Sequence, residues 1–276
     1  MYRIAIVTDS TADIPEEIIA QHRIHVVPNY IVIDGQSMED GKDMTREDFY
    51  TNLPKMKTFP TTATASSGLY QSLYSHLFQE SFSHILSIHA SSLLSGIFNA
   101  ASIAARPFGE RIRVIDSQYV SLGLGFQVLS AAENVLSEPL ESIPTVIANV
   151  RQRVHVIALL DTLEYVRRSG RVSWARARIG DLLHIKPLVE IKAGRILSLG
   201  EVRTRRKGIE RLVEKLRNLG KLERLAILHT NAEQEAHRFL DNLRLDSDTI
   251  SFCVNVTPVI GAHTGPNALG FAVVVR

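Results

Sequence analysis

The chain has 276 residues, of which 45% are hydrophobic and 22% are charged, and its formal net charge is +2. These values describe an ordinary globular protein with room for two domains, and the nearly neutral charge argues against a general nucleic-acid binder. The single cysteine, Cys253, excludes an internal disulfide framework and a cysteine-based zinc cluster. Because no apolar run reaches the length of a signal peptide core or a membrane span, we expect a cytoplasmic protein.

In the first half of the chain, short apolar runs alternate with helical patterns, the longest of which covers residues 119–136. Uninterrupted apolar strands are typical of a parallel sheet that is buried on both faces, and their alternation with helices indicates βαβ units. Between them, we expect an acidic turn at residues 38–43 and a hydroxyl-rich loop at 60–67. The expected strands are residues 3–7, 25–33 with a break at Pro28, 85–88 and 113–115.

The pattern changes near residue 154. A strand at 155–160 precedes a helical segment at 162–183, and two later strand-like runs are joined by the turn Lys192-Ala193-Gly194-Arg195, which is a hairpin signal. We therefore predict an α/β protein with a parallel-sheet domain over residues 1–153 and an α+β domain with a mixed or antiparallel sheet over residues 154–276.

Hydroxyl side chains follow three of the predicted parallel strands, in Thr8-Asp9-Ser10-Thr11, Ser91-Ser92 and Asp116-Ser117. Ligands of an open parallel sheet bind beyond the carboxyl ends of its strands, so these loops and the 60–67 loop should line one crevice. Hydroxyl groups and free N–H groups at helix starts bind a small anion, either phosphate or carboxylate. The plainer alternative for the serines after residue 90 is the capping of a buried helix.

The second half adds three candidate donors. His263 and Thr264 lie in a loop rich in glycine and proline, and Arg171 follows a break in a run of cations. A lone histidine is more often structural, and arginines at a helix end often only balance the helix dipole. The sequence has no phosphate-binding P-loop, nucleophile elbow or zincin histidine pair, so we predict no catalytic residue and no metal ligand. An enzyme acting on a small phosphorylated or acyl substrate could nevertheless use the same crevice.

These motifs, taken together, resemble the DegV family, and the resemblance spans the whole chain in order. The segments that carry it are Thr8-Asp9-Ser10-Thr11-Ala12-Asp13, Glu39-Asp40-Gly41, Pro60-Thr61-Thr62, Ser91-Ser92-Leu93-Leu94-Ser95-Gly96, Asp116-Ser117, Arg167-Arg168-Ser169-Gly170-Arg171, Ile185-Lys186-Pro187 and His263-Thr264-Gly265-Pro266.

The resemblance implies that one long-chain fatty acid lies between the two domains, with its carboxylate among the hydroxyl loops. By motif position, Thr62 and Ser92 would bind the carboxylate, and Ser91 is the other candidate for the serine donor. His263 would be a further donor at the head group, beside Thr264. Arg171 would lie near the site or on the surface that faces a kinase.

The resemblance also implies a partner. Family members present their fatty acid to a separate fatty acid kinase, which makes an acyl phosphate, a precursor in phospholipid metabolism. We therefore expect a lipid-binding protein rather than an enzyme, with a fatty acid as its ligand and no cofactor. Contact with a membrane would be transient, and nucleic acid would not be a partner.

Overall fold

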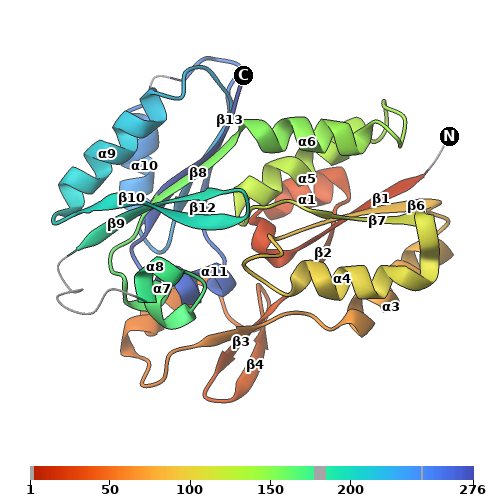
Figure 1. Ribbon diagram of the computed structural model, residues 1–276, viewed down its shortest axis with the longest axis horizontal. Helices are drawn as coiled ribbons and strands as arrows, with labels where there is room; N and C mark the ends of the chain where they lie inside the picture. Colours follow the sequence, from red (N-terminus) through yellow and green to blue (C-terminus); the bar gives the residue numbers. More distant parts are fainter. Residues whose placement is uncertain (1–2, 177–184, 244) are drawn as a thin grey trace.

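The computed structural model describes residues 3–176, 185–243 and 245–276. In this part of the chain the strands form three sheets (Figure 1). A four-stranded parallel sheet has the order β2-β1-β6-β7, and a six-stranded mixed sheet has the order β10-β9-β8-β13-β11-β12. A small antiparallel sheet has the order β4-β3-β5. The predicted α/β class, with a parallel sheet followed by a mixed one, is confirmed.

The four-stranded sheet is built from the apolar runs of the first half. After its first residue, β1 is buried throughout, and so is β6. Because all pairings are parallel, the carboxyl ends of these strands meet at one edge of the sheet. The strands are β1 (Ile4–Asp9), β2 (His25–Val27), β6 (His84–His89) and β7 (Ile112–Asp116), and the helices around them are α1 (Glu16–His22), α3 (Ser67–Gln79), α4 (Ile97–Ala105), α5 (Leu122–Asn134) and α6 (Ile143–Arg153).

The six-stranded sheet contains the predicted hairpin. Ala193 and Gly194 both have positive φ, as a tight two-residue turn between antiparallel strands requires. Only β11 and β12 pair in parallel. The strands are β8 (Val154–Leu159), β9 (Lys186–Lys192), β10 (Arg195–Val202), β11 (Leu222–His229), β12 (Ile250–Asn255) and β13 (Leu269–Val275), and the helices on one face are α9 (Arg205–Arg217) and α10 (Glu233–Asp241).

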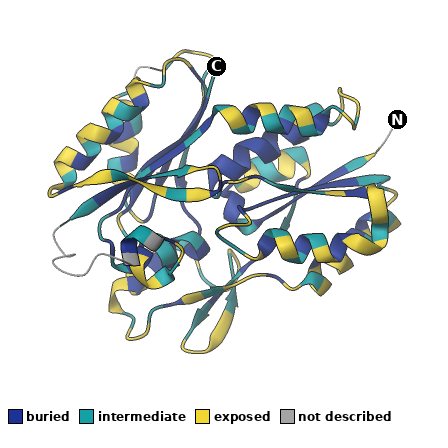
Figure 2. Cartoon of the chain, in the orientation of Figure 1, coloured by how far each residue is buried: buried dark blue, intermediate teal, exposed yellow. Residues whose placement is uncertain are grey.

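The two faces of the six-stranded sheet are covered differently. Odd-numbered residues such as Ile157 and Phe271 pack with side chains of α9 and α10. Even-numbered residues such as Val156 and Leu228 belong to the same hydrophobic cluster as α5 and the four-stranded sheet. Residues 122–132 of α5 are all buried, and this helix is among the darkest parts of Figure 2. The main core therefore continues from one sheet to the other across residue 154.

The small sheet corrects two expectations, the one about the 60–67 loop and the one about the acidic turn. The expected break at Pro28 is present in the run 25–33: β2 stays in the parallel sheet, and β3 (Tyr30–Ile33) joins the small sheet. The 60–67 loop contains a strand, β5 (Thr61–Ala63), that pairs with β3. The third strand of the small sheet is β4 (Gln36–Glu39), which ends within the segment expected to be an acidic turn.

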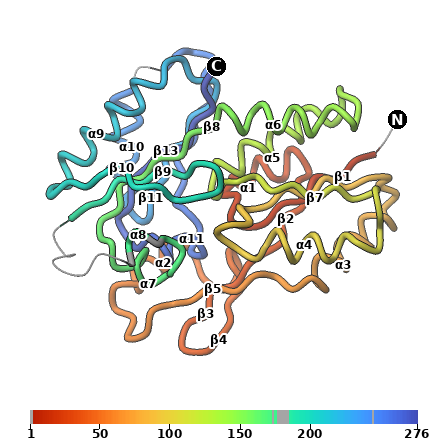
Figure 3. The backbone as a smooth tube through the Cα atoms, viewed as in Figure 1, coloured from red at the N-terminus to blue at the C-terminus, as the bar shows by residue number. Residues whose placement is uncertain are grey.

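Short helices lie beside the small sheet (Figure 3). The predicted helical segment at 162–183 has the expected interruption at Ser169-Gly170: one short helix ends at Ser169 and another begins at Ser173. Residues 177–183 of this segment lie outside the described part. Among the described residues, no helix combines the length and apolar character that crossing a bilayer requires. The short helices are α2 (Arg46–Asn52), α7 (Glu164–Ser169), α8 (Ser173–Arg176) and α11 (Pro258–Thr264).

Candidate functional site

A cavity of about 210 Å³ lies where the three sheets meet. One wall comes from the loops at the carboxyl ends of β1 and β6, as predicted for an open parallel sheet. The opposite wall is the face of the six-stranded sheet that carries Val156 and Ala158 of β8, together with their pairing partners Ile191 and Val189 of β9. Most of the lining is apolar, including Ile97, Val156, Ala158, Leu160, Val189, Ile191, Ile196, Leu228, Val256, Val259, Ile260 and Leu269.

The polar end of the cavity is built from β5 and α11. Thr62 Oγ1 and His263 Nε2 are 3.0 Å apart and share a hydrogen bond. The two side chains meet although they are 201 residues apart in the chain, because α11 packs against β3 and β5. Thr264 follows on the same helix and lines the cavity, where its hydroxyl donates to the carbonyl oxygen of Ile260, 3.3 Å away.

The charge at this end favours an anion. Burial is the main cause, and the positive charge of Arg171 the second, of the lowering of the His263 pKa to about 4. The imidazole of His263 is therefore neutral near pH 7 and can donate from one ring nitrogen. Arg171 lines the cavity and is exposed, and its Nη1 donates to the carbonyl oxygen of Ser169 at 2.6 Å. Four of the predicted site residues thus lie together: Thr62, His263, Thr264 and Arg171.

The two predicted serines, Ser91 and Ser92, do not join these four residues at the cavity. Ser91 is buried, and its hydroxyl donates to the carbonyl oxygen of Gly194 at 2.9 Å, in the turn between β9 and β10. The hydroxyl of Ser92 donates to Asp116 Oδ2 at 2.5 Å. Neither side chain is part of the cavity lining. Both hydroxyls thus bond to other parts of the protein, and the structure does not bring them to the Thr62–His263 pair.

Other hydroxyl residues also line the cavity, and Thr64 and Ser95 are two of those that were missed as site residues. Ser95 Oγ accepts from the backbone N–H of Ile97, the first residue of α4, at 3.2 Å. The sequence carried a signal for this position, since Ser95 is the serine nearest to the start of the expected helix. Thr64 belongs to the 60–67 segment that was expected to line the crevice, although it was not singled out, and it lies in this wall because β5 pairs with β3.

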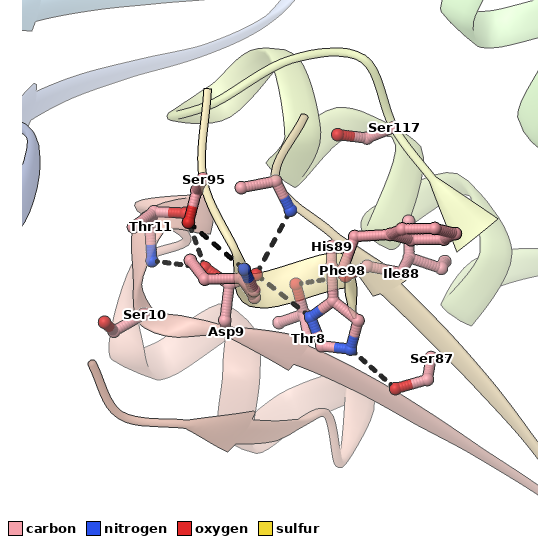
Figure 4. Close-up of polar contacts among 12 residues, drawn as sticks. Thr8, Asp9, Ser10, Thr11, Ser87, Ile88, His89, Ser95, Phe98 and Ser117 are labelled. Carbon is pink, nitrogen blue, oxygen red and sulfur yellow. Dashed lines mark hydrogen bonds and ion pairs between the residues drawn. The ribbon is translucent and has the colours of Figure 1, made fainter. Parts of the chain in front are cut away.

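A buried polar network lies behind this wall (Figure 4). Asp9 Oδ2 is 3.0 Å from His89 Nδ1, and His89 Nε2 is 2.7 Å from Ser87 Oγ. The order of atoms is that of a Ser-His-Asp triad. However, Asp9, His89 and Ser87 have no exposed surface and do not line the cavity, and Tyr74 OH occupies the other side of Ser87 Oγ at 2.8 Å. The arrangement leaves no room for a substrate at this serine.

The network instead supports the cavity wall. Asp9 accepts hydrogen bonds from the backbone N–H groups of Thr11 and Ala90, which both line the cavity. Burial would raise the pKa of Asp9, but the hydrogen bond and charge of His89, with further donors, hold it below its ordinary value. An ionised carboxylate with this many donors ties the end of β1 to the end of β6.

Comparison with known proteins assigns the chain to a protein family. The model of the DegV family, described as uncharacterised proteins, matches residues 3–276. The chain belongs to the DegV family. Protein DegV of Bacillus subtilis is 35% identical to it over 276 residues, which cover 97% of each chain.

Solved structures of other DegV proteins share the whole fold. A DegV family protein from Thermus thermophilus, described as binding fatty acid, matches with a TM-score of 0.89 and 30% identity over 99% of this chain and 100% of the other. DegV of Bacillus subtilis, described as a fatty acid binding protein, matches with a TM-score of 0.88 and 32% identity over the full length of both chains.

Proposed function

We propose that this DegV-family chain binds one long-chain fatty acid in the cavity between its sheets. The observation that carries the proposal is the lining itself: apolar side chains of the six-stranded sheet and of the loops beyond the four-stranded sheet, ending at the Thr62–His263 pair with Arg171 beside it. An acyl tail fits an apolar wall, and a carboxylate fits neutral donors next to a cation. The fatty-acid binding of relatives at 30% and 32% identity supports the same ligand class.

The tail and the carboxylate of such a ligand would contribute differently to binding. Each methylene that leaves water contributes about 0.8 kcal/mol, so the tail provides most of the affinity. A hydrogen bond to a charged group contributes about 1.5–3 kcal/mol, so Thr62 and His263 determine where the carboxylate lies. Arg171 adds long-range attraction without being buried. The head group would thus be fixed by the small sheet and α11, and the tail by the six-stranded sheet and the loops beyond the four-stranded sheet.

We further propose that the protein presents the carboxylate to a separate fatty acid kinase, which forms an acyl phosphate for phospholipid precursor metabolism. The family resemblance supports this step, and so does the exposure of Arg171 at the polar end, because a partner could reach the head group from that side. In this proposal the chain is a substrate-presenting subunit and not itself an enzyme. It works in the cytoplasm and meets a membrane only transiently.

Lipid analysis of the purified protein tests the proposal. Native mass spectrometry and solvent extraction should find about one long-chain fatty acid per chain. Delipidated protein should melt at a lower temperature and recover on addition of palmitate or oleate, because a ligand that binds only the folded state stabilises it. If extraction finds no fatty acid and neither lipid changes the melting temperature, the proposal is wrong. A phosphorylated small molecule found instead would favour an enzyme.

A further inference from the structure

Two acidic residues of the sequence motifs, Asp13 and Asp40, lie outside the cavity lining and form a second polar cluster. Asp13 is buried with 1% of its surface exposed, yet three groups contact its carboxylate. The backbone N–H of Thr257 donates to Oδ1 at 2.8 Å, and Ser121 Oγ donates to Oδ2 at 2.6 Å. Arg46 Nη1 forms an ion pair with Oδ1 at 3.1 Å. Parts of the chain 244 residues apart therefore meet at one carboxylate.

All of these contacts converge on the segment just before α11. Thr257 Oγ1 donates to Asp40, with distances of 2.6 and 2.5 Å to its two oxygens. Arg46 also donates to the carbonyl oxygen of Asn255, and Tyr50 OH donates to that of Val256 at 2.8 Å. Residues 255–257 are thus held by side chains from α2, from the residue that follows β4 and from the loop after β1. We call Asp13, Asp40 and Arg46 the α11 junction.

The short helix α11 connects the α11 junction to the polar end of the cavity. α11 covers Pro258–Thr264, and its sixth residue is His263. At a rise of 1.5 Å per residue, Thr257 and His263 are about 9 Å apart along the helix axis. The tyrosine ring of Tyr50 packs directly against Gly261, where a β-carbon would be 2.2 Å from its hydroxyl oxygen. A shift of the first turn of α11 would consequently move His263 relative to Thr62.

We propose that Asp13 is a positioning residue of the head-group site: its buried carboxylate, with Arg46 and Asp40, fixes the start of α11 and so keeps His263 in hydrogen-bonding distance of Thr62. The consequence for ligand affinity rests on the proposed function, whereas the consequence for the position of His263 does not. Asp13 acts through α11 and touches no ligand.

The α11 junction makes this positioning sensitive to acid. Burial raises the pKa of Asp13 to about 6, although Arg46, Ser121 and Thr257 partly oppose the rise. Protonation removes the charge that Arg46 and the N–H of Thr257 contact, so the hold on α11 weakens as the pH falls below about 6. The other charged group that acts on Asp13 is Asp40, whose negative charge raises the pKa of Asp13. Burial also raises the pKa of Asp40, and the charge of Asp9 raises it further.

The groups around His263 titrate in a different range. Its own pKa is lowered to about 4 by burial first and then by Arg171. The pKa of His229, which also lines the cavity, is lowered to about 4, with burial as the main cause and Arg46 contributing. A change at His263 near pH 6 would therefore report the α11 junction and not the titration of either imidazole.

The test compares Asp13→Asn with wild type. Asn keeps the shape of the side chain but cannot carry the charge, and Ser121 can turn its hydroxyl to accept. We expect palmitate titrated into delipidated Asp13→Asn protein at pH 7.5 to bind about fivefold more weakly, less than the tenfold or more that losing a head-group hydrogen bond would cause. We also expect the imidazole NMR resonances of His263, assigned with His263→Gln, to shift in the ligand-free protein.

A matched control is Glu47→Gln, which removes one negative charge from an exposed position of α2, next to Arg46. It should change neither palmitate affinity nor the resonances of His263. Lowering the pH from 7.5 to 5 should weaken palmitate binding more in wild type than in Asp13→Asn, because only wild type loses the charge. The titration of palmitate itself is common to both proteins and cancels in this comparison.

Each outcome decides the proposal. Wild-type affinity and unchanged His263 resonances in Asp13→Asn would overturn it. If palmitate does not bind wild type, the proposed function fails, and the resonances of His263 still judge the positioning role. If Asp13→Asn does not fold, a pH titration of wild-type His263 replaces it: an inflection near pH 6 supports the proposal, and a single transition near pH 4 rejects it.

Discussion

The head-group pair offers the sharpest prediction about binding. Thr62→Val keeps the branched shape of the side chain and removes only the hydroxyl that lies 3.0 Å from His263 Nε2. A fatty-acid carboxylate at this end would lose one donor, and His263 would lose its partner. A hydrogen bond to a charged group contributes about 1.5–3 kcal/mol, which corresponds to a roughly 10- to 150-fold weaker affinity at 25 °C.

The assay is a titration of palmitate into delipidated protein. The single tryptophan, Trp174, donates from its indole to the carbonyl oxygen of Ile196, which lines the cavity, so its fluorescence can follow binding. The matched control is Thr61→Val, because Thr61 precedes Thr62 on β5 and is exposed. Circular dichroism confirms the fold of both variants. Wild-type affinity in Thr62→Val would show that the carboxylate does not bind at this hydroxyl.

Three further predictions follow from contacts around the cavity. Ser92→Ala should leave palmitate affinity within about twofold of wild type. It should lower the free energy of unfolding, measured by urea titration, by about 0.5–1.5 kcal/mol, because the hydroxyl of Ser92 donates to Asp116. A large loss of affinity would show that Ser92 does bind the head group. Arg171→Ala should reduce kinase-coupled formation of acyl phosphate more than it reduces palmitate binding, because a phosphoryl-transfer site needs positive charge near the transferring oxygens; equal turnover in both proteins would exclude that role. The third concerns pH: with the pKa of Asp13 raised from 3.8 to about 6 in the folded state, its contribution to stability is greatest below 3.8 and is lost as the pH rises through 6. Between about pH 4.5 and pH 7.5, wild type should therefore lose roughly 2 kcal/mol of unfolding free energy relative to Asp13→Asn. Urea titrations in which the free energy of unfolding changes equally with pH in both proteins would contradict this.

Sequence reasoning found the large sheets because their signals are local. Apolar runs such as β1 and β6 are buried on both faces, and the Ala193-Gly194 turn has the positive φ angles that specify a hairpin. The small sheet has no such signal. β5 is three residues long, follows Pro60 and pairs with a strand some 30 residues earlier, so its threonines read as a loop.

The hydroxyl residues show the same limit at the site. Thr62, Ser91 and Ser92 all lie in hydroxyl-rich segments, and nothing local tells a free hydroxyl from one that bonds to the protein. The partner of Ser91 is the carbonyl oxygen of Gly194, 103 residues away, and the partner of Thr62 is His263. Motif position therefore identified the region of the site, whereas the assignment of each donor needed the fold.

One face of β8 contributes both to the hydrophobic core and to the cavity wall. On β8, Val156 belongs to the main hydrophobic core and lines the cavity, and Ala158 continues the lining two residues later. Because side chains alternate along a strand, this boundary can move only in steps of two residues, or about 6.6 Å. A larger side chain at position 158 would extend the core and shorten the cavity by one such step. For the fatty acid that we propose as the ligand, the longest tail that fits would then change in increments set by the pleat of the sheet.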